Sequence, residues 1–302
     1  MGFSIKDIDF VLGEERIDLS KYGTDFDRLV NATGIPAVYR SSKSAIDLAE
    51  KSARKVLDRN RVKIDALVMV TQSPNDFLPA NSCTLHDRLK LPASVLTFDY
   101  NQGCSGFVQS LFVLHHLLST FNHILIVCAD VYRSKLRPGD RSTEAVFSDG
   151  SAAILLSSEP RLEIMSARHF TQGDRRSLLY QSVKSNENDG YLYMAGREIW
   201  IFTKKYVVPQ LLEVINDVGT NQVKNIFIHQ ASKVVVEGIA QQMPRSELVR
   251  QNYQEVGNTV SSSVPILMKD YLNDLYSGIN ILSGFGVGLT SSTIALRPIN
   301  NR

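Results

Sequence analysis

The sequence predicts an α/β protein built from layers of helices and strands, and two observations support this prediction. Segments with helical periodicity alternate with short apolar runs along most of the 302 residues, which favours layered α/β over segregated elements. The apolar runs are nearly continuous rather than alternating, as in HILIVCAD of residues 123–130. Such runs are typical of strands in a sheet that is covered on both faces.

The N-terminal half is expected to alternate between helices and strands. Residues 46–60 place apolar side chains on one face at helical spacing, and a buried strand is expected over residues 64–73. Residues 145–158 are expected to form two short strand pieces around a glycine. The same patterns predict further helices over residues 81–91 and 105–121, and further strands over residues 94–100 and 123–130.

The C-terminal half repeats this order of elements without obvious residue identity, so a duplication is inferred from topology alone. We therefore predict two similar parts, residues 1–160 and residues 161–302. Pro209 lies inside a helix expected over residues 197–218 and predicts a kink there. The polar stretch of residues 171–197 is expected to be an irregular insertion or a cover over a site. Further helices are expected over residues 231–243 and 261–278, with strands over residues 223–232 and around a glycine-rich turn in residues 279–296.

Composition and charge argue against several classes of protein. The formal net charge is +2 and no basic run stands out, so nothing indicates a nucleic-acid partner. Three cysteines make a poor disulfide framework, and their odd number favours a reducing compartment. No run of 18 apolar residues is present, and the N-terminal segment lacks the apolar region of a signal peptide. We therefore expect a cytoplasmic protein with no membrane partner.

Cys104 lies in an unusual setting for a core cysteine. It stands between Gly103 and Gly106, after an apolar run and at the start of an expected helix. A helix N-terminus carries about half a positive charge and free amide groups, so we expect it to favour the reactive thiolate there. The same amides can stabilise an oxyanion. A buried, inert cysteine remains the alternative, and it fits Cys83 and Cys128 better.

Two further polar residues follow apolar segments in the C-terminal half. His229 ends a predicted strand, in FIHQAS, where α/β sheets place their chemistry. Asn258 precedes a predicted helix in VGNTVSSSVP. Taken alone, His229 is more often a structural histidine, and Asn258 is more often a helix cap or turn residue. The cysteines and histidines lack the spacing of metal ligands, so no metal site is predicted.

Four motifs occur in order along the chain. They are GCSGF at Cys104, HQAS at His229, GNTVSSSVP at Asn258 and GFGVGLTSS around Val287. Together they resemble the β-ketoacyl-[acyl carrier protein] synthase III family, a branch of the thiolase superfamily of condensing enzymes. NATGIPAVYR, DRSTEAVFSDGSAAILL and MAGREIWIF resemble further segments of that family. The resemblance spans residues 5–296 in the family's order.

The resemblance implies a thiolase-like five-layer α-β-α-β-α fold made of two similar halves, and a homodimer. It implies that Cys104 attacks an acyl thioester and holds the acyl group. His229 and Asn258 would then hydrogen-bond the thioester oxygen of malonyl-[acyl carrier protein] while carbon dioxide leaves. The resulting enolate would attack the acyl-cysteine and give a 3-oxoacyl product, for fatty-acid initiation or a specialised pathway.

The resemblance also implies how the acyl carbonyl is activated and how the substrates arrive. The backbone amides of Cys104 and Val287 would form an oxyanion hole for this carbonyl. Because only the amide is used, Val287 in place of the family's glycine could be tolerated. Since a β-branched residue disfavours positive φ, it could instead reshape the pocket. The substrates would arrive as thioesters of coenzyme A or of the phosphopantetheine of an acyl carrier protein. No other cofactor is implied.

Departures from the family's motifs limit what the resemblance implies about the acyl donor. Arg141 matches a nucleotide-contacting arginine of the family, but the tryptophan and arginine expected near Arg28 and Ala32 are missing. Ser232 replaces the asparagine of HQAN, and an arginine expected near Val234 is also replaced. The donor is therefore expected to be an acyl carrier protein or a specialised coenzyme A ester.

Three more residues are candidates for substrate binding. Trp200 stands where a phenylalanine usually lines the substrate passage in the family. Phe77 matches a residue that in relatives reaches across the dimer to the partner's acyl pocket, although a core phenylalanine would look the same in sequence. Arg197 could contact a phosphopantetheine or a carrier, or could be a solvated arginine.

The same residues are compatible with functions other than condensation. Acyl-Cys104 could pass its group to an oxygen or nitrogen acceptor, in secondary-metabolite or surface-sugar biosynthesis. Such a transfer needs no enolate, so retention of both His229 and Asn258 favours condensation. A non-catalytic subunit would be expected to lose part of this triad, and a thiolase proper would need a second cysteine near residues 283–292, where the sequence has none.

Overall fold

The computed structural model describes residues 2–182 and 188–299. Within these residues, one hydrogen-bonded sheet contains nine strands, in the order β11-β10-β12-β13-β7-β6-β4-β5, with β1 paired to β7. These strands are β1 (Phe3–Leu12), β4 (Ala66–Val70), β5 (Leu96–Tyr100), β6 (His123–Asp130), β7 (Gly150–Thr171), β10 (Val223–Ile228), β11 (Val249–Arg250), β12 (Ile279–Gly286) and β13 (Thr290–Pro298).

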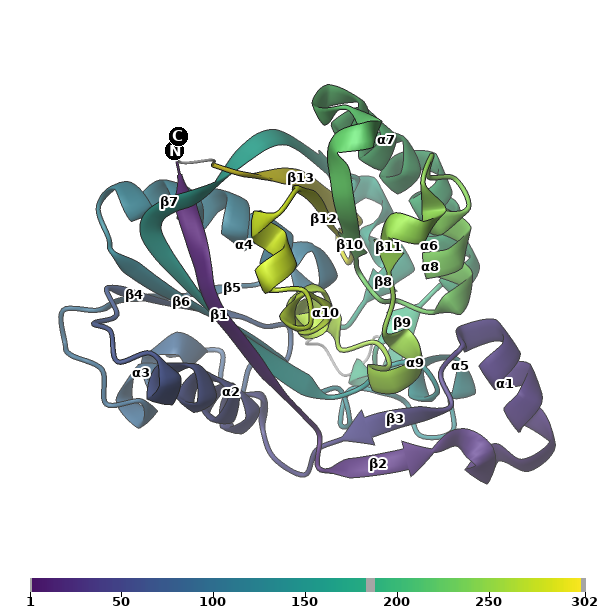
Figure 1. Cartoon of the computed structure of the whole chain (residues 1–302). Helices are drawn as coiled ribbons and strands as arrows, with labels where there is room; N and C mark the ends of the chain where they lie inside the picture. The colour runs from purple at the N-terminus through teal and green to yellow at the C-terminus, as the bar shows by residue number, and fades with distance from the viewer. Residues whose placement is uncertain (1, 183–187, 300–302) are drawn as a thin grey trace.

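Strand β7 belongs to two leaves of this sheet. Its residues 150–157 lie between β1 and β6, and its residues 162–171 pair with β13. One leaf contains the parallel strands β5, β4 and β6, and the other contains the parallel strands β11, β10 and β12. The predicted boundary between residues 160 and 161 therefore falls inside a continuous strand, which Figure 1 shows curving across the molecule.

Helices form three layers, one between the two leaves and one on the outer face of each leaf, as Figure 1 shows. Helices α4 (Gly106–Leu114) and α10 (Ser263–Lys269) lie between the leaves and share one core with strands of both. The outer face of the first leaf is covered by α2 (Ala45–Arg59) and α3 (Asn81–Arg88). The other outer face is covered by α7 (Val208–Val218) and α8 (Lys233–Ala240). The five-layer α-β-α-β-α prediction is thus confirmed.

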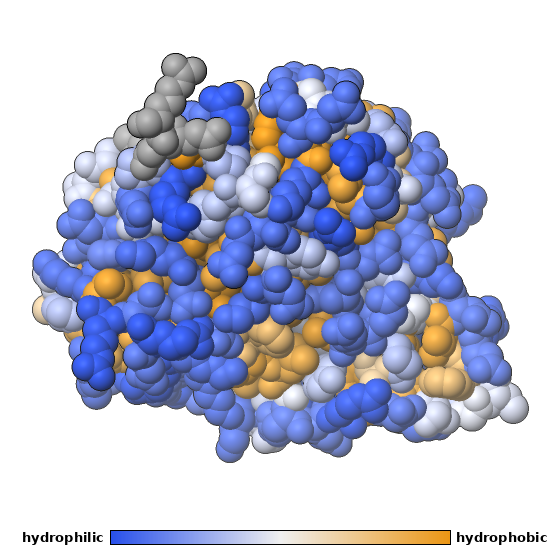
Figure 2. Space-filling view, in the orientation of Figure 1, coloured by the Kyte–Doolittle hydropathy of each residue, from blue (hydrophilic) through white to orange (hydrophobic). Residues whose placement is uncertain are grey.

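Alternate residues of the central strands face different cores, which explains their continuous apolar sequence. In β4, Val68 and Val70 contribute to the core around α4 and α10, whereas Leu67 and Met69 pack towards α2. A strand buried on both faces has no solvated side and so needs no polar alternation. Hydrophilic side chains instead cover most of the face seen in Figure 2.

Most predicted helices are present, with shorter or interrupted ends. The helix predicted over residues 105–121 ends at Leu114 and continues as a 3₁₀ turn, residues 115–119. The helix predicted over residues 197–218 consists of α6 (Gly196–Phe202), a π-helical turn and α7. The π-helical turn, Thr203–Val207, ends just before Pro209, which has no backbone N–H to donate, and the kink at Pro209 stays a prediction.

The prediction for residues 145–158 is wrong, because only the second strand piece forms. Residues 145–149 contribute a single bridge, from Phe147 to Asn258, before β7 begins at Gly150. Strand β7 then continues to Thr171 through Pro160, which the sequence pattern did not indicate. Pro160 is tolerated because β7 changes partners at this point, where ladder bonds are interrupted.

Smaller elements surround this scaffold. Of the predicted irregular stretch, residues 183–187 lie outside the described residues. No helix in the described parts of the chain has the length and apolar character needed to span a bilayer. The remaining elements are β2 (Glu15–Asp18), α1 (Phe26–Thr33), β3 (Ala37–Arg40), α5 (Arg141–Glu144), β8 (Leu179–Tyr180), β9 (Tyr193–Met194) and α9 (Tyr253–Val256).

Candidate active site

The structure brings Cys104, His229 and Asn258 to one small cavity of about 40 Å³. Cys104 lies in a 3₁₀ turn between β5 and α4, and His229 directly follows β10. Asn258 precedes the 3₁₀ turn that leads into α10. The two helices between the leaves therefore both begin at this cavity, which we call the cysteine chamber.

The cysteine chamber is almost entirely apolar apart from these three residues. A volume of about 40 Å³ holds about one water molecule. Interactions between polar groups are stronger in such a dry site than in water. The other residues that line the chamber are Tyr132, Phe147, Leu179, Met194, Ile199, Ala231, Val235, Phe285, Gly286 and Val287.

The expectation that the helix start keeps Cys104 as a thiolate is wrong for the resting protein. Burial raises the pKa of the Cys104 thiol to about 12, and the carboxylate of Asp130 acts in the same direction. The backbone N–H of Cys104 itself lowers this pKa, but by less. Cys104 is therefore a neutral thiol, 6% exposed, whose sulfur borders the chamber.

His229 is neutral for the same physical reason. Burial lowers the pKa of His229 to about 3, so its ring carries no charge at neutral pH. Its Nδ1 lies 3.0 Å from the hydroxyl oxygen of Ser263, the first residue of α10. The same oxygen accepts a hydrogen bond from the backbone N–H of Gln230 at 2.8 Å.

These contacts fix which ring nitrogen of His229 carries the proton. Ser263 is fully buried, and within the described residues its hydroxyl hydrogen has only Nδ1 of His229 as an acceptor. A buried hydroxyl that donated to nothing would cost about 1–3 kcal/mol. The favoured arrangement therefore has Ser263 donating to Nδ1, which leaves the proton of the neutral ring on Nε2.

The side chain of Asn258 is oriented by a hydrogen bond from the backbone N–H of Val260, a residue with positive φ. Its Oδ1 accepts from the N–H of Val260 at 3.0 Å, which leaves the Nδ2 donors for the chamber. Val260 holds φ at 54°, a conformation that β-branched residues strongly disfavour. The backbone of Asn258 is also clamped by Ser148, whose N–H donates to its carbonyl at 2.7 Å.

A buried carboxylate ties the Asn258 turn to the other half of the fold. Both the hydroxyl and the N–H of Ser261 donate to Oδ2 of Asp130, at 2.5 and 3.2 Å. The Oδ1 of Asp130 accepts from the backbone N–H of Gln72 at 2.8 Å. Asp130 ends β6, so it links the first leaf to the turn that presents Asn258.

The turn around Val287 lies against Cys104 without the positive φ at Val287 on which the expected reshaping depended. Positive φ values fall on the neighbouring glycines, 156° at Gly286 and 127° at Gly288, and not on Val287. A side chain at Gly286 would place its Cβ 3.2 Å from the sulfur of Cys104. The glycine thus allows β12 to approach the sulfur closely. The oxyanion role of the two amides stays a prediction.

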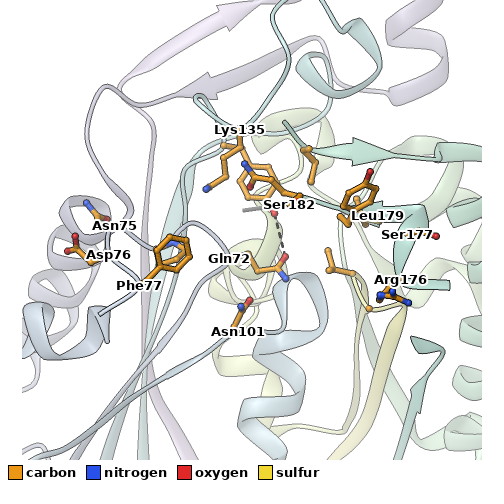
Figure 3. Close-up of a pocket in the computed structure, with 17 residues that line it drawn as sticks. Gln72, Asn75, Asp76, Phe77, Asn101, Lys135, Arg176, Ser177, Leu179 and Ser182 are labelled. Carbon is orange, nitrogen blue, oxygen red and sulfur yellow. Dashed lines mark hydrogen bonds between the residues drawn. The ribbon is translucent and has the colours of Figure 1, made fainter. Parts of the chain in front are cut away.

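A larger cavity of about 710 Å³ adjoins the cysteine chamber. Tyr132, Leu179 and Val287 line both cavities and so form the wall between them. Phe77 lines the larger cavity and is 80% exposed, so it is not a core residue. Figure 3 shows this cavity with its lining side chains.

The other predicted substrate-binding residues line neither cavity. Arg141 is paired with Asp25 at the surface. Arg197 is exposed on α6, and the half-buried Trp200 lies under the ammonium group of Lys204, 4.2 Å from the ring centre. Ser232 precedes α8, next to the lining residue Ala231. The exposed Cys83 also contradicts the expectation of a core cysteine, whereas Cys128 is buried as expected.

Sequence reasoning missed the residues that position the triad. Ser261 and Ser263 lie in the recognised motif GNTVSSSVP, but only the fold shows that their hydroxyls point to Asp130 and His229. Met194 was missed too, although it lies in the polar stretch that the sequence predicted as a cover, and it does line the chamber. Within the described residues, no group of three or more His, Cys, Asp or Glu could hold a metal ion.

The fold is thiolase-like, and its candidate site places a cysteine beside a neutral histidine and an asparagine. The model of the 3-oxoacyl-[acyl carrier protein] synthase III family matches residues 98–173, and the model of its C-terminal part matches residues 215–297. Together these matches span more than half of the chain. The chain belongs to the 3-oxoacyl-[acyl carrier protein] synthase III family and is an enzyme of this type.

Individual relatives agree with this assignment. The β-ketoacyl-[acyl carrier protein] synthase III of Clostridium perfringens is 30% identical over 281 residues, which cover 85% of this chain and 86% of the relative. The 3-oxoacyl-(acyl carrier protein) synthase III of Pseudomonas aeruginosa superposes with a TM-score of 0.89 at 26% identity over 98% of each chain. A priming β-ketosynthase of a polyketide pathway shares the fold, with a TM-score of 0.87 at 20% identity over 98% of this chain and 96% of that one.

Burial of His229 predicts a loss of stability in acid. Its folded pKa is about 3 against an ordinary 6.5, so below about pH 6.5 the unfolded chain takes up a proton that the folded chain does not. Lowering the pH from 7 to 5 should therefore remove about 2 kcal/mol from the free energy of unfolding through this group. Urea unfolding at both pH values measures this loss.

The variant His229→Gln serves as the reference for that measurement. Between pH 7 and pH 5, the free energy of unfolding of this variant should fall by about 2 kcal/mol less than that of the wild type. His115 and His169 also have pKa values lowered by burial, but they contribute equally to both proteins and cancel. If the free energy of unfolding fell equally in the two proteins between pH 7 and pH 5, the neutral, buried state of His229 would be contradicted.

Ser263→Ala tests the tautomer of His229. Without the hydroxyl donor, His229 is free to place its proton on Nδ1, so we expect malonyl decarboxylation to lose about tenfold or more in kcat with little change in KM. Loading of Cys104 should stay unchanged, and Ser263→Thr should retain most of the activity. Ser262→Ala, which removes only a hydroxyl bonded to Thr259, is the control. Equal losses in loading and decarboxylation would instead indicate a general structural defect.

Proposed function

We propose that this chain transfers an acyl group from a thioester donor to Cys104 and condenses it with malonyl-[acyl carrier protein]. The product is a 3-oxoacyl thioester, formed with loss of carbon dioxide. The observation that supports this function is the convergence of Cys104, His229 and Asn258 on one dry chamber. Neutral donors in such a chamber suit a reaction in which negative charge develops on an oxygen.

Loading is a thiol–thioester exchange. The sulfur of Cys104 forms a bond to the acyl carbon, and the bond from this carbon to the carrier's sulfur breaks. The proton of the neutral Cys104 thiol ends on the departing carrier thiol, so the exchange needs no other proton donor. The high pKa of Cys104 means that this proton leaves as the attack proceeds rather than beforehand.

Condensation then uses both neutral donors. Carbon dioxide leaves the malonyl group, and the electron pair of the broken C–C bond passes into an enolate. The Nε2–H of His229 and the Nδ2–H of Asn258 donate to the enolate oxygen, where each donor is worth about 3 kcal/mol. The enolate carbon attacks the acyl carbonyl and expels the sulfur of Cys104 as a thiolate, which takes up a proton from water.

The partners of this reaction follow from the same proposal. An acyl carrier protein delivers the malonyl group, and the donor is an acyl thioester of coenzyme A or of a carrier protein. Both substrates bring their acyl groups already activated as thioesters, so no bound cofactor enters the reaction. Retention of both His229 and Asn258 supports condensation over transfer to an oxygen or nitrogen acceptor.

A homodimer is part of the proposal. Strand β5 ends the sheet with only β4 as its neighbour, and all five of its residues are at least partly exposed. An unpaired, partly apolar edge strand is a ready surface for pairing with a second copy. Phe77 and Leu78 are 80% and 88% exposed, the highest values among the large apolar residues described. Contact with a second copy would cover them.

Separate substitutions of the triad should divide the reaction into its steps. Cys104→Ala should abolish the acyl adduct that intact-mass analysis detects after incubation with acyl thioesters. His229→Ala and Asn258→Ala should each keep the adduct but lose about a hundredfold or more in decarboxylative condensation. If the His229→Ala variant condensed at nearly the wild-type rate, the role proposed for His229 would be wrong.

The double substitution Phe77→Asp with Leu78→Asp tests the dimer. Two buried carboxylates at the contact would be strongly unfavourable, so sedimentation velocity should show a dimer for the wild type and a monomer for the variant. Val234→Asp, at a residue 47% exposed on α8, is the matched control and should remain a dimer. A wild-type monomer at micromolar concentration would overturn this part of the proposal.

A further inference from the structure

The acyl group on Cys104 needs more space than the cysteine chamber offers. Pockets that hold small molecules usually measure about 300–1,000 Å³, whereas the chamber measures about 40 Å³. The adjoining cavity of about 710 Å³ has the required volume, and it shares three wall residues with the chamber. An acyl chain attached to Cys104 would therefore have to extend past Tyr132, Leu179 and Val287 into this larger cavity.

The larger cavity has many polar side chains among its apolar ones. Of its seventeen lining residues, eleven have side chains that donate or accept hydrogen bonds. An alkyl chain would remove water from these groups without replacing its hydrogen bonds, which is costly. The eleven are Gln72, Asn75, Asp76, Asn101, Tyr132, Lys135, Arg176, Ser177, Tyr180, Gln181 and Ser182.

Polar groups begin beside the nucleophile itself. The carboxamide of Gln72 packs over Gly103, where a Cβ would lie 2.1 Å from its Oε1. This oxygen accepts from the hydroxyl of Tyr132 at 3.5 Å, the dashed line in Figure 3. Among the described residues, the Nε2 of Gln72 has no protein acceptor and is free to donate to an acyl chain.

Lys135 supplies a charge further along the cavity. Figure 3 shows its side chain extending towards the space between Phe77 and Gln72. Within the described residues, its ammonium group has no carboxylate within 4.0 Å, although Asp76 and Arg176 also line the cavity. Burial lowers the pKa of Lys135, and the more distant Asp130 opposes this shift. A half-buried ammonium without a counter-ion in a cavity is complementary to an anion.

We propose that the acyl group carried by Cys104 ends in an anionic, hydrogen-bonding group such as a carboxylate, which Lys135 binds in the larger cavity. This inference rests on the proposed function, because it requires that Cys104 is acylated. It makes Lys135 a specificity-determining residue that contacts the far end of the donor's acyl chain. The matching donors are half-thioesters of short dicarboxylic acids.

The test uses N-acetylcysteamine thioesters, which lack the phosphates of coenzyme A and of phosphopantetheine. Succinyl, glutaryl and adipyl thioesters are each compared with their own methyl ester, which has nearly the same shape and no charge. Intact-mass analysis gives the rate of Cys104 acylation for each. The wild type should load at least one acid about tenfold or more faster than its methyl ester.

Variants assign that preference to one residue. Lys135→Met should abolish or invert the preference for the acid, and Lys135→Arg should retain it. Lys43→Met, a cation that does not line this cavity, should behave as the wild type. Methyl esters loaded as fast as the acids, or an acid preference that survives in Lys135→Met, would overturn the inference.

Two other results separate this inference from the function on which it rests. If Lys135→Met slowed acids and methyl esters equally, the lysine would shape the cavity rather than bind a charge, and the inference would be overturned alone. If no thioester acylated Cys104 in the wild type, the proposed function would fail, and the inference with it.

Discussion

The packing of α4 and α10 between the two leaves of the sheet is the constraint on which the rest of the structure depends. Both helices are buried in one core with strands of each leaf, so neither can shift without opening that core. Because both begin at the cysteine chamber, their packing fixes the positions of Cys104 and of the turn that bears Asn258. The contact between Asp130 and Ser261 adds a polar link between the two halves at the same place.

Burial, rather than local dipoles, sets the protonation states in the chamber. A helix N-terminus stabilises a negative charge by about 0.3–1 kcal/mol, and by about 2 kcal/mol at most. Raising the pKa of a thiol from 9.0 to about 12 corresponds to about 4 kcal/mol in the opposite direction. The same desolvation keeps His229 neutral. In a dry chamber the thiolate is therefore disfavoured. The hydrogen bonds of the two neutral donors are stronger there than they would be in water.

The two cavities differ in size and in lining, and the proposals assign them different tasks. The cysteine chamber is small, apolar and lined mostly by residues of the recognised motifs, and it would hold the reacting thioester whatever the rest of the acyl group. The larger cavity is lined mostly by polar residues from outside those motifs, such as Gln72 and Lys135. An enzyme built in this way can keep its reaction while the larger cavity determines which acyl group it accepts.

The sequence by itself determined the layered α/β class and most helices and strands, and the resemblance of its motifs to a known family identified the three residues at the chamber. Periodicity and apolar runs act locally, and each motif includes its own glycines and polar residues, so short segments were enough. The tertiary structure decided the length of β7, the thiol state of Cys104, and the partners of Ser261 and Ser263. Strand pairing, desolvation and hydrogen bonds between segments more than thirty residues apart depend on the whole chain. No local pattern in the sequence contains them.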